Sequence, residues 1–259
     1  MSRSMTERYV VTDIPHRIVY AYLDEPPFGA PGPDGGAIGY DAELAENVLH
    51  AVGVTHIDVV LVKFPDLIGG VMSGRWTMNT GMFVTPERSQ SVAFSRPIWA
   101  LVDGFVVKAG NPKGLRSYAD AARDPSVKLA GVRGNVQVDS AFKAGVPAER
   151  MRLFESQHDI IAEIRSGRID AYPGAALAHR GFIEATGADG VEVVQLESQA
   201  GTAPLGAFSY AKESRALKDA VDAYLAEYLG TDQHLALAKK YGLTMEEISP
   251  VIAPPSPGH

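Results

Sequence analysis

The feature that most constrains the fold is the alternation of strand-like and helix-like segments along most of the chain. Residues 17–23 (RIVYAYL) alternate apolar and small side chains, which is typical of a strand. Residues 40–52 follow, with Leu44 and Val48 at the four-residue spacing of one helix face. Residues 57–64 (IDVVLVKF) form a nearly continuous apolar run, which is typical of a strand buried on both faces. This alternation predicts an α/β fold with mainly parallel sheets and helices on both sheet faces.

The rest of the chain repeats this plan. Further strands are expected at residues 76–83, 104–108, 128–133, 152–155, 169–172, 191–196 and 205–212. Further helices are expected at residues 66–73, 117–123, 139–143, 159–165, 175–185, 215–229 and 234–241, and from residue 86 onward. About ten strands are many for one compact sheet, so two α/β lobes are predicted.

Two segments, residues 104–110 and 205–212, are the natural places for the chain to cross between the lobes, and we expect them to act as hinges. The predicted organisation therefore has a discontinuous first lobe and a continuous second one. Lobe 1 is expected to comprise residues 16–105 and 208–248, lobe 2 residues 106–207, and the flexible termini residues 1–15 and 249–259.

Composition excludes several classes of protein. Hydrophobic residues make up 46% and charged residues 21% of the 259 residues, which is ordinary for a globular chain and too apolar for a disordered one. A net charge of −7 argues against non-specific nucleic-acid binding, because phosphates would not be neutralised. The absence of cysteine excludes disulfides, zinc thiolates, iron–sulfur clusters and cysteine nucleophiles. No apolar run reaches the roughly 18 residues of a membrane span.

The first eight residues are polar, and no apolar stretch with a small-residue cleavage site follows them, so no signal peptide is expected in this sequence. This pattern is expected either of a protein that stays in the cytoplasm or of one whose leader has been removed.

Signatures of catalysis are missing from the sequence. It contains no P-loop, no GxSxG elbow and no GxGxxG after a strand, and its seven histidines show no metal-ligand spacing. The sequence therefore predicts no catalytic residue, no metal and no cofactor.

Arg88 is the strongest local candidate for a binding residue. Thr85 and Pro86 are expected to cap and open a helix, which places Arg88 in its first turn. Backbone N–H groups that lack partners at a helix start favour anions, and a guanidinium can bind both oxygens of a carboxylate. The alternative is an arginine that points to solvent or pairs with Glu87 or Asp103.

Aromatic residues lie at the ends of the expected strands. Phe28 follows the first strand, Phe64 ends the second and Phe83 ends the third. Ligands bind outside the carboxyl ends of strands in open parallel sheets, so these rings are candidates for a cage around a cation. The alternative is that they are ordinary core residues. Trp76 and Trp99 are both interpreted mainly as residues of the core or of the lobe surface.

Several runs together resemble a known family: EPPFGAPGPDGGAIGYDAELAENVLHAVG, FPDLIGGVMSGRW, GMFVTPERSQSVAFSRPI and SGRIDAY. From about residue 16 to 241 the chain resembles the solute-binding proteins of polar amino-acid ABC transporters, which are type II periplasmic binding proteins of family 3. The resemblance implies a monomer of two lobes that close around a small ligand and deliver it to a membrane permease. It also implies a periplasmic or extracytoplasmic location and no enzymatic activity.

Residue by residue, the resemblance implies that Arg88 clamps the ligand carboxylate and that Phe28 and Phe64 pack on the ligand. The GxT-like loop of the second lobe reads RGNV here, so Asn135 stands in for a threonine beside Val136. Tyr172, at the end of SGRIDAY, completes the implied second-lobe set.

Two departures from the family bear on the ligand. Amino-acid binders grip the ammonium with an acid about five positions after the Asp of GRxDA, and that position is Ala175 here. Phe83 stands where those proteins often have a small hydroxyl residue. The two changes favour a delocalised or alkylated cation over a primary amine.

This pattern resembles the ectoine and hydroxyectoine branch, in which an acid and phenylalanine rings surround a cyclic amidinium. Glu25, Phe28, Phe64 and Phe83 fit those roles, with Arg88 on the carboxylate. The register of Phe83 depends on a strand that is one residue shorter than the family norm and has Thr77 in place of the usual Asp. The alternatives are a binding protein for a polar or basic amino acid or an opine-like derivative, a receptor sensor domain and, more remotely, a dehydratase-like enzyme on the same fold.

Overall fold

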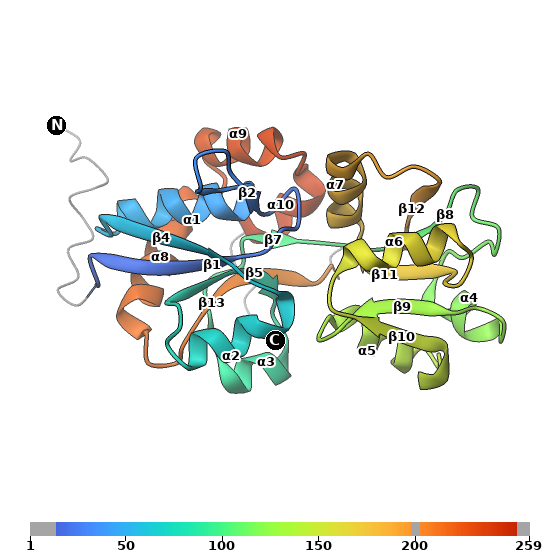
Figure 1. Ribbon diagram of the computed structural model, residues 1–259. Coiled ribbons are helices and arrows are strands. Elements are labelled where there is room, and N and C mark those ends of the chain that lie inside the picture. The colour runs from blue at the N-terminus through green and yellow to red at the C-terminus, as the bar shows by residue number, and fades with distance from the viewer. Residues whose placement is uncertain (1–13, 198–202, 253–259) are drawn as a thin grey trace. The chain divides into compact units, whose positions relative to one another are not determined.

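The computed structural model describes residues 14–197 and 203–252. The chain forms two compact units, each an α/β structure. Unit 1 takes the described residues of Met1–Val62, Asp66–Ala100 and Pro204–His259, and unit 2 takes those of Lys63–Pro65 and Leu101–Ala203. Figure 1 shows a sheet flanked by helices in each unit. The chain passes from unit 1 to unit 2 after Ala100 and returns to unit 1 after Ala203. The sequence predicted these boundaries a few residues later, after residues 105 and 207.

The main sheet of unit 1 has the order β4-β1-β5-β13-β6, and β7 pairs with β13. β1 runs parallel to both β4 and β5, whereas β13 is antiparallel to β5, β6 and β7. A separate hairpin joins β2 to β3. The bounds are β1 Arg17–Tyr22, β2 Ala30–Pro31, β3 Ala37–Ile38, β4 His56–Leu61, β5 Met78–Phe83, β6 Ala93–Phe94, β7 Trp99–Ala100 and β13 Leu205–Tyr210.

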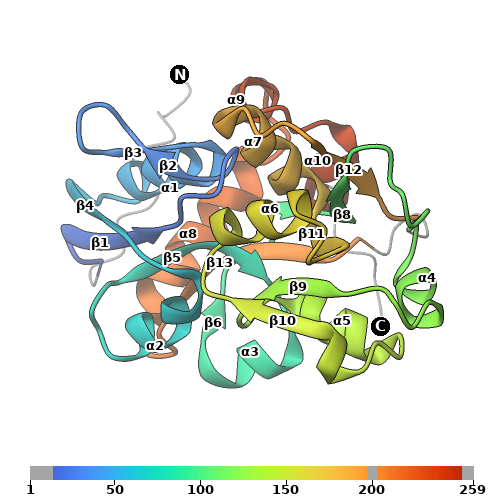
Figure 2. The same ribbon diagram turned by 45° about the vertical axis from the view of Figure 1, so that its right-hand side comes forward.

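The helices of unit 1 bury one face each. Leu44 and Val48 of α1 are fully buried, as their spacing predicts, and α1 packs against α8 and α9. Figures 1 and 2 both show the β2–β3 hairpin beside α1. The bounds are α1 Tyr40–Ala51, α2 Leu67–Met72, α3 Pro86–Ser91, α8 Arg215–Tyr228, α9 Asp232–Lys240 and α10 Met245–Ile252.

Unit 2 has a five-stranded sheet of order β10-β9-β11-β8-β12. Alternate residues of its strands enter two core clusters, one with Phe105 and Leu129 and the other with Val106 and Ala130, so each face of the sheet is buried. The strands are β8 Asp103–Lys108, β9 Leu129–Val132, β10 Met151–Phe154, β11 Ala171–Ala175 and β12 Val191–Gln195. The helices are α4 Tyr118–Arg123, α5 Val136–Lys143, α6 Gln157–Arg165 and α7 Ala176–Thr186, with a short 3₁₀ turn at η3 Ala148–Arg150. A second 3₁₀ turn, η2 Phe64–Asp66, has its first two residues in unit 2 and its last in unit 1.

The α/β class predicted from the sequence is confirmed, and the sheets prove to be mixed. In unit 2, β9 is parallel to β10 and β11, but β8 is antiparallel to β11 and β12. In unit 1, β13 plays the same antiparallel role. These are the two strands expected to cross between lobes. Each instead lies within one sheet and is antiparallel to the strands it pairs with, so neither sheet is mainly parallel.

The expectation of a flexible end from residue 249 is wrong for its first part. Residues 249–252 belong to α10, a helix that contains Pro250 and packs against β7. Ile248 and Val251 are buried, 1% and 4% exposed, and this burial at helical spacing outweighs the proline. Residues 253–259, and residues 1–13 at the other end, lie outside the described residues.

Candidate functional site

Glu25 and Phe28 are held together in one closed turn that follows β1. The N–H of Glu25 donates to the carbonyl of Gly29 at 2.9 Å, and the N–H of Phe28 donates to the carbonyl of Glu25 at 3.0 Å. The Pro26–Pro27 peptide inside this turn is cis. Phe28 is buried, and the side chain of Glu25 is half-buried.

This turn is fastened to the start of α1. The carbonyls of Pro27 and Phe28 accept the N–H groups of Tyr40 and Asp41 at 2.8 and 3.0 Å, so two helix-start donors find partners. Gly39 precedes the helix at φ 126°, and a Cβ there would lie 2.4 Å from the Phe28 carbonyl oxygen. Only glycine fits this junction, and the positions of Glu25 and Phe28 are therefore tied to α1.

Asp41, in the first turn of α1, is a buried carboxylate with three donors. Its Oδ2 accepts the N–H of Gly81 at 2.8 Å and the hydroxyl of Thr80 at 3.0 Å, and its Oδ1 accepts Nε1–H of Trp99 at 3.0 Å. Burial raises the pKa of Asp41 to about 6, and the three hydrogen bonds act in the opposite direction. Asp41 thereby joins α1 to β5 and β7.

Trp99 brings two of the predicted site rings together. Its ring centroid lies 5.5 Å from that of Phe28 at an interplanar angle of 45°, and 5.3 Å from that of Phe83 at 86°. These are the tilted and edge-to-face arrangements that aromatic pairs prefer. Trp99 is buried and Phe83 half-buried. The expectation that Trp99 lies in the core or on the lobe surface is thus confirmed as core, but it omitted these contacts.

Arg88 is placed as the sequence predicts, after a helix start capped by Thr85 with Pro86 as first residue. The hydroxyl of Thr85 accepts the backbone N–H of Arg88 at 3.1 Å. The guanidinium is buried and its Nη1 donates to the carbonyl of Phe83 at 2.8 Å. The alternative of a solvent-exposed Arg88 is therefore wrong. Asp103 was one of the two acids considered as partners of Arg88. It accepts hydrogen bonds from the Tyr118 hydroxyl and from Nε2–H of Gln137.

The carboxyl group of Glu25 titrates close to neutrality. Burial raises its pKa from 4.5 to about 7, and the charge of Asp41 acts in the same direction. A cation bound beside Glu25 would favour its ionised form. Unit 1 thus presents a row of contacts from Glu25 through Phe28, Trp99 and Phe83 to Arg88, with an acid at one end and a guanidinium at the other.

The other predicted residues group with unit 2. Phe64 lies in η2 and packs against the core cluster that contains Val132 and Tyr172. A Cβ on Gly134 would meet the Phe64 ring at 3.7 Å, in ordinary contact. Asn135 precedes α5 and Val136 is its first residue, and both are half-buried.

Tyr172 is a core residue of β11, 3% exposed, and its ring centroid lies 4.6 Å from that of His179. Burial lowers the pKa of His179 to about 3, so this imidazole is neutral at physiological pH. Ala175 stands at the position where the family resemblance places an acid in amino-acid binders. It is the last residue of β11 and pairs with Asp103 of β8. Burial raises the pKa of Asp103.

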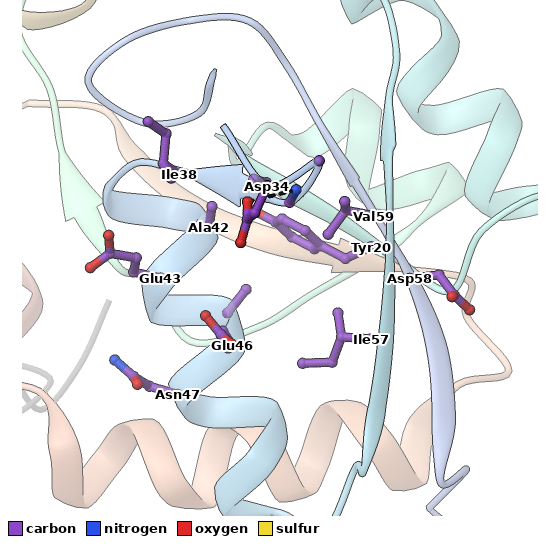
Figure 3. Close-up of a pocket in the computed structure, with 14 residues that line it drawn as sticks. Tyr20, Asp34, Ile38, Ala42, Glu43, Glu46, Asn47, Ile57, Asp58 and Val59 are labelled. Atoms are coloured by element: carbon purple, nitrogen blue, oxygen red, sulfur yellow. Dashed lines mark hydrogen bonds between the residues drawn. The ribbon is translucent and has the colours of Figure 1, made fainter. Parts of the chain in front are cut away.

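A separate surface pocket of about 670 Å³ lies in unit 1 between the β2–β3 hairpin, α1 and β4 (Figure 3). Four acids line it: Asp34, Glu43, Glu46 and Asp58. Glu43 is paired with Lys240 at 2.7 Å, and Asp58 with Arg17 at 2.6 Å. No predicted site residue lines this pocket, so it is distinct from the row that ends at Arg88.

Sequence reasoning missed Asp41 and the contacts of Trp99. The only signal for Asp41 was an acid directly after an expected helix start, a place where exposed acids are common. Within residues 14–197 and 203–252, no group of three or more His, Asp or Glu side chains could hold a metal ion. In the same ranges no helix is long and apolar enough to cross a membrane.

The structure thus combines two α/β units with a row of an acid, aromatic rings and an arginine in unit 1. The chain belongs to the bacterial extracellular solute-binding proteins, family 3, whose model matches residues 18–244. The resemblance identified from the sequence motifs is thus confirmed. The family consists of substrate-binding proteins of ABC transporters for amino-acid-like ligands, and implies a permease partner and an extracytoplasmic location.

Individual relatives agree with this assignment. A probable amino-acid ABC transporter periplasmic-binding protein, y4tE of Sinorhizobium fredii, is 32% identical over 90% of this chain and 79% of its own length. The octopine-binding periplasmic protein of Rhizobium meliloti is 25% identical over 56% of each chain. Among solved structures, EhuB in complex with hydroxyectoine matches with a TM-score of 0.80 and 28% identity, covering 96% of both chains.

Proposed function

We propose that this protein captures ectoine, hydroxyectoine or a closely similar cyclic zwitterion for uptake by an ABC transporter. The observation that carries the proposal is the row in unit 1 with Glu25 at one end and Arg88 at the other. Such a row suits a ligand with a delocalised cation and a carboxylate. The similarity to EhuB, solved with hydroxyectoine, supports the same ligand class.

In this proposal each group of unit 1 has a separate role. Arg88 binds the carboxylate through its buried guanidinium, whose planar N–H groups suit the two oxygens of a carboxylate and whose Nη1 also donates to the Phe83 carbonyl. Glu25 supplies the counter-charge to the amidinium. The half-buried face of Phe83, and Phe28 beside Glu25, offer π surfaces that attract a delocalised cation.

Unit 2 is proposed to contribute Phe64, Asn135, Val136 and Tyr172 to the same ligand, with a hinge motion of the kind that periplasmic binding proteins use. Ala175 offers no carboxylate for a primary ammonium. This supports a ligand whose cation is held by Glu25 and aromatic rings instead.

A second candidate is an opine or a polar or basic amino acid, which the similarity to the octopine-binding protein favours. Calorimetric titration of purified, ligand-stripped protein distinguishes the two. Ectoine and hydroxyectoine are compared with octopine, arginine, glutamine and glycine betaine. Saturable heat from ectoine with silence from the amino acids is expected. Silence from ectoine with binding of octopine or an amino acid would refute the ectoine proposal and retain Arg88 as a carboxylate clamp.

We also propose that the protein acts as a monomer and catalyses no reaction on its ligand. A precursor of cyclohexadienyl dehydratase, AncCDT-1, shares the fold at 25% identity and a TM-score of 0.73, and it is itself an amino-acid-binding protein. Prolonged incubation of ectoine with stoichiometric protein, followed by proton NMR, is expected to return ectoine unchanged. Light scattering with and without ligand tests the monomer.

A further inference from the structure

Trp99 occupies a slot that the backbone of two strands leaves open for it. Gly206 of β13 is its pairing partner, and a Cβ at Gly206 would lie 1.9 Å from the indole ring. A Cβ at Gly81 of β5 would lie 2.9 Å from its Nε1. Neither glycine is among the residues with positive φ, so their small size is needed for the close approach of the ring.

The orientation of the indole in this slot is fixed by Asp41. Nε1–H of Trp99 donates to Oδ1 of Asp41 at 3.0 Å, while Thr80 and Gly81 hold the other carboxylate oxygen. All these groups are buried or half-buried, so the hydrogen bonds act in surroundings where unpaired polar atoms are costly. The ring can neither slide nor turn without losing a contact or a hydrogen bond.

Phe28 and Phe83 reach this fixed ring from different parts of the chain. Phe28 comes from the turn after β1 and meets it at 45°, while Phe83 comes from the end of β5 and meets it at 86°. The two predicted ligand-contacting rings therefore share one support. Their separation and tilt, which decide the shape of cation that fits against them, depend on where the indole lies.

We propose that Trp99, anchored by Asp41 and the Gly81–Gly206 slot, is a positioning residue that sets the placement of Phe28 and Phe83 and thereby the selectivity for a compact cyclic cation. This inference rests on the proposed function for the identity of the ligand. It goes beyond that function in assigning selectivity to a residue behind the two rings.

The chain offers a matched control in its other tryptophan. Trp76 is also a buried residue of unit 1, 6% exposed against 3% for Trp99. Its indole likewise lies against a glycine, Gly70, and donates to a buried side chain, Asn79. The guanidinium carbon of Arg75 lies 4.8 Å from the centroid of its ring. Trp76→Phe and Trp99→Phe thus remove equivalent indoles, and each variant retains a single tryptophan as a fluorescent reporter.

The first measurement titrates both variants with ectoine by tryptophan emission and by calorimetry, with urea unfolding in parallel. Both substitutions are expected to lower the unfolding midpoint by similar amounts. Trp76→Phe is expected to keep wild-type affinity within about two-fold and a ligand-dependent change in Trp99 emission. Trp99→Phe is expected to bind ectoine about 10-fold more weakly, because two aromatic contacts are weakened, and to lose selectivity over glycine betaine.

A structural role alone would lower both midpoints but leave the affinity and selectivity of Trp99→Phe within about two-fold of wild type, which would overturn the proposal. If Trp99→Phe fails to fold, the proposal is tested by the ligand-dependent change in Trp99 emission of the Trp76→Phe protein. Silence of Trp99 emission while calorimetry shows saturation would also contradict the inference.

A ligand-free measurement keeps this test separate from the proposed function. In the Trp76→Phe background, Phe83→Leu is expected to shift Trp99 emission and weaken its near-ultraviolet circular dichroism. In the Trp99→Phe background, Phe83→Leu is expected to leave Trp76 emission unchanged. If ectoine is silent in the wild-type protein, the proposed function fails, and the titrations are repeated with whichever comparator binds. If Phe83→Leu leaves Trp99 emission unchanged, the positioning role fails whatever the ligand is.

Discussion

Binding of a cationic ligand is expected to weaken as the pH falls, because Glu25 must be ionised to pair with it. In the free protein, burial and the charge of Asp41 raise the pKa of Glu25 to about 7. A bound cation lowers that pKa, so binding below pH 7 expels a proton. The sign is fixed: affinity is full above the free-state pKa and is lost as the pH drops through it. An amidinium and a carboxylate both keep their charges over this range.

The size of the effect follows from the pKa of about 7. The ionised fraction of Glu25 falls to about one half at pH 7, about one eleventh at pH 6 and about one hundredth at pH 5. Since protonated Glu25 is expected to bind the ligand about 10-fold more weakly than ionised Glu25, the apparent association constant is expected to fall about 8-fold between pH 8 and pH 5. At pH 7, roughly half a proton is expected to leave for each ligand bound.

Calorimetric titration of ectoine at four pH values, each in two buffers of different ionisation enthalpy, measures both quantities. Glu25→Gln is expected to bind about 10-fold more weakly at pH 8 but with nearly constant affinity down to pH 6. Glu87→Gln, at an exposed acid of α3, is the matched control and should retain the wild-type profile. A wild-type affinity that stays level from pH 8 to pH 5 would refute the reasoning about Glu25.

Three further predictions concern unit 1. Arg88→Ala is expected to weaken ectoine binding about 100-fold or more by calorimetry, because the ligand carboxylate loses charged hydrogen bonds. The control Arg75→Ala, at an exposed arginine of the same unit, should keep the affinity within two-fold of wild type. Equal effects of the two substitutions would refute the role of Arg88 as a carboxylate clamp. Gly206→Ala is expected to lower the urea-unfolding free energy by about 1–3 kcal/mol, because its Cβ would lie 1.9 Å from Trp99; unchanged stability would mean that the slot is not tight. Since the folded-state pKa of Asp41 is raised from 3.8 to about 6, its contribution to stability declines as pH rises from about 4 to about 6, by up to about 3 kcal/mol. Asp41→Asn should accordingly gain stability relative to wild type over that interval, and a constant difference in unfolding free energy would contradict the raised pKa.

Local patterns in the sequence predicted much of the fold because they depend on neighbouring residues. Thr85 caps its helix as expected and accepts the N–H of Arg88, and Ser117 likewise caps α4 and accepts the N–H of Asp120. The buried faces of α1 and α8 follow from apolar spacing. The strand expected from residue 76 begins at Met78, because Trp76 and Thr77 precede its pairing with β1.

The connection between site residues could not be predicted in the same way. Phe28, Phe83 and Trp99 meet only because β5 and β7 both pair with β13, which follows more than 100 residues later in the chain. Nothing local to Asp41 indicates that its carboxylate receives donors from two strands. Contacts of this kind depend on sheet order, which the hydrophobic pattern leaves open.

The position of β13 in the chain has a consequence for biosynthesis. β13 lies between β5 and β6 in its sheet, yet it emerges from the ribosome only after Leu101–Ala203. At about 5–20 residues per second, roughly 100 residues take roughly 5–20 s to synthesise. Throughout that interval β5 has one unpaired edge, a surface open to association with other chains. Unit 2 is nearly contiguous and can complete its own sheet meanwhile, so the second unit in sequence is expected to finish folding before the first.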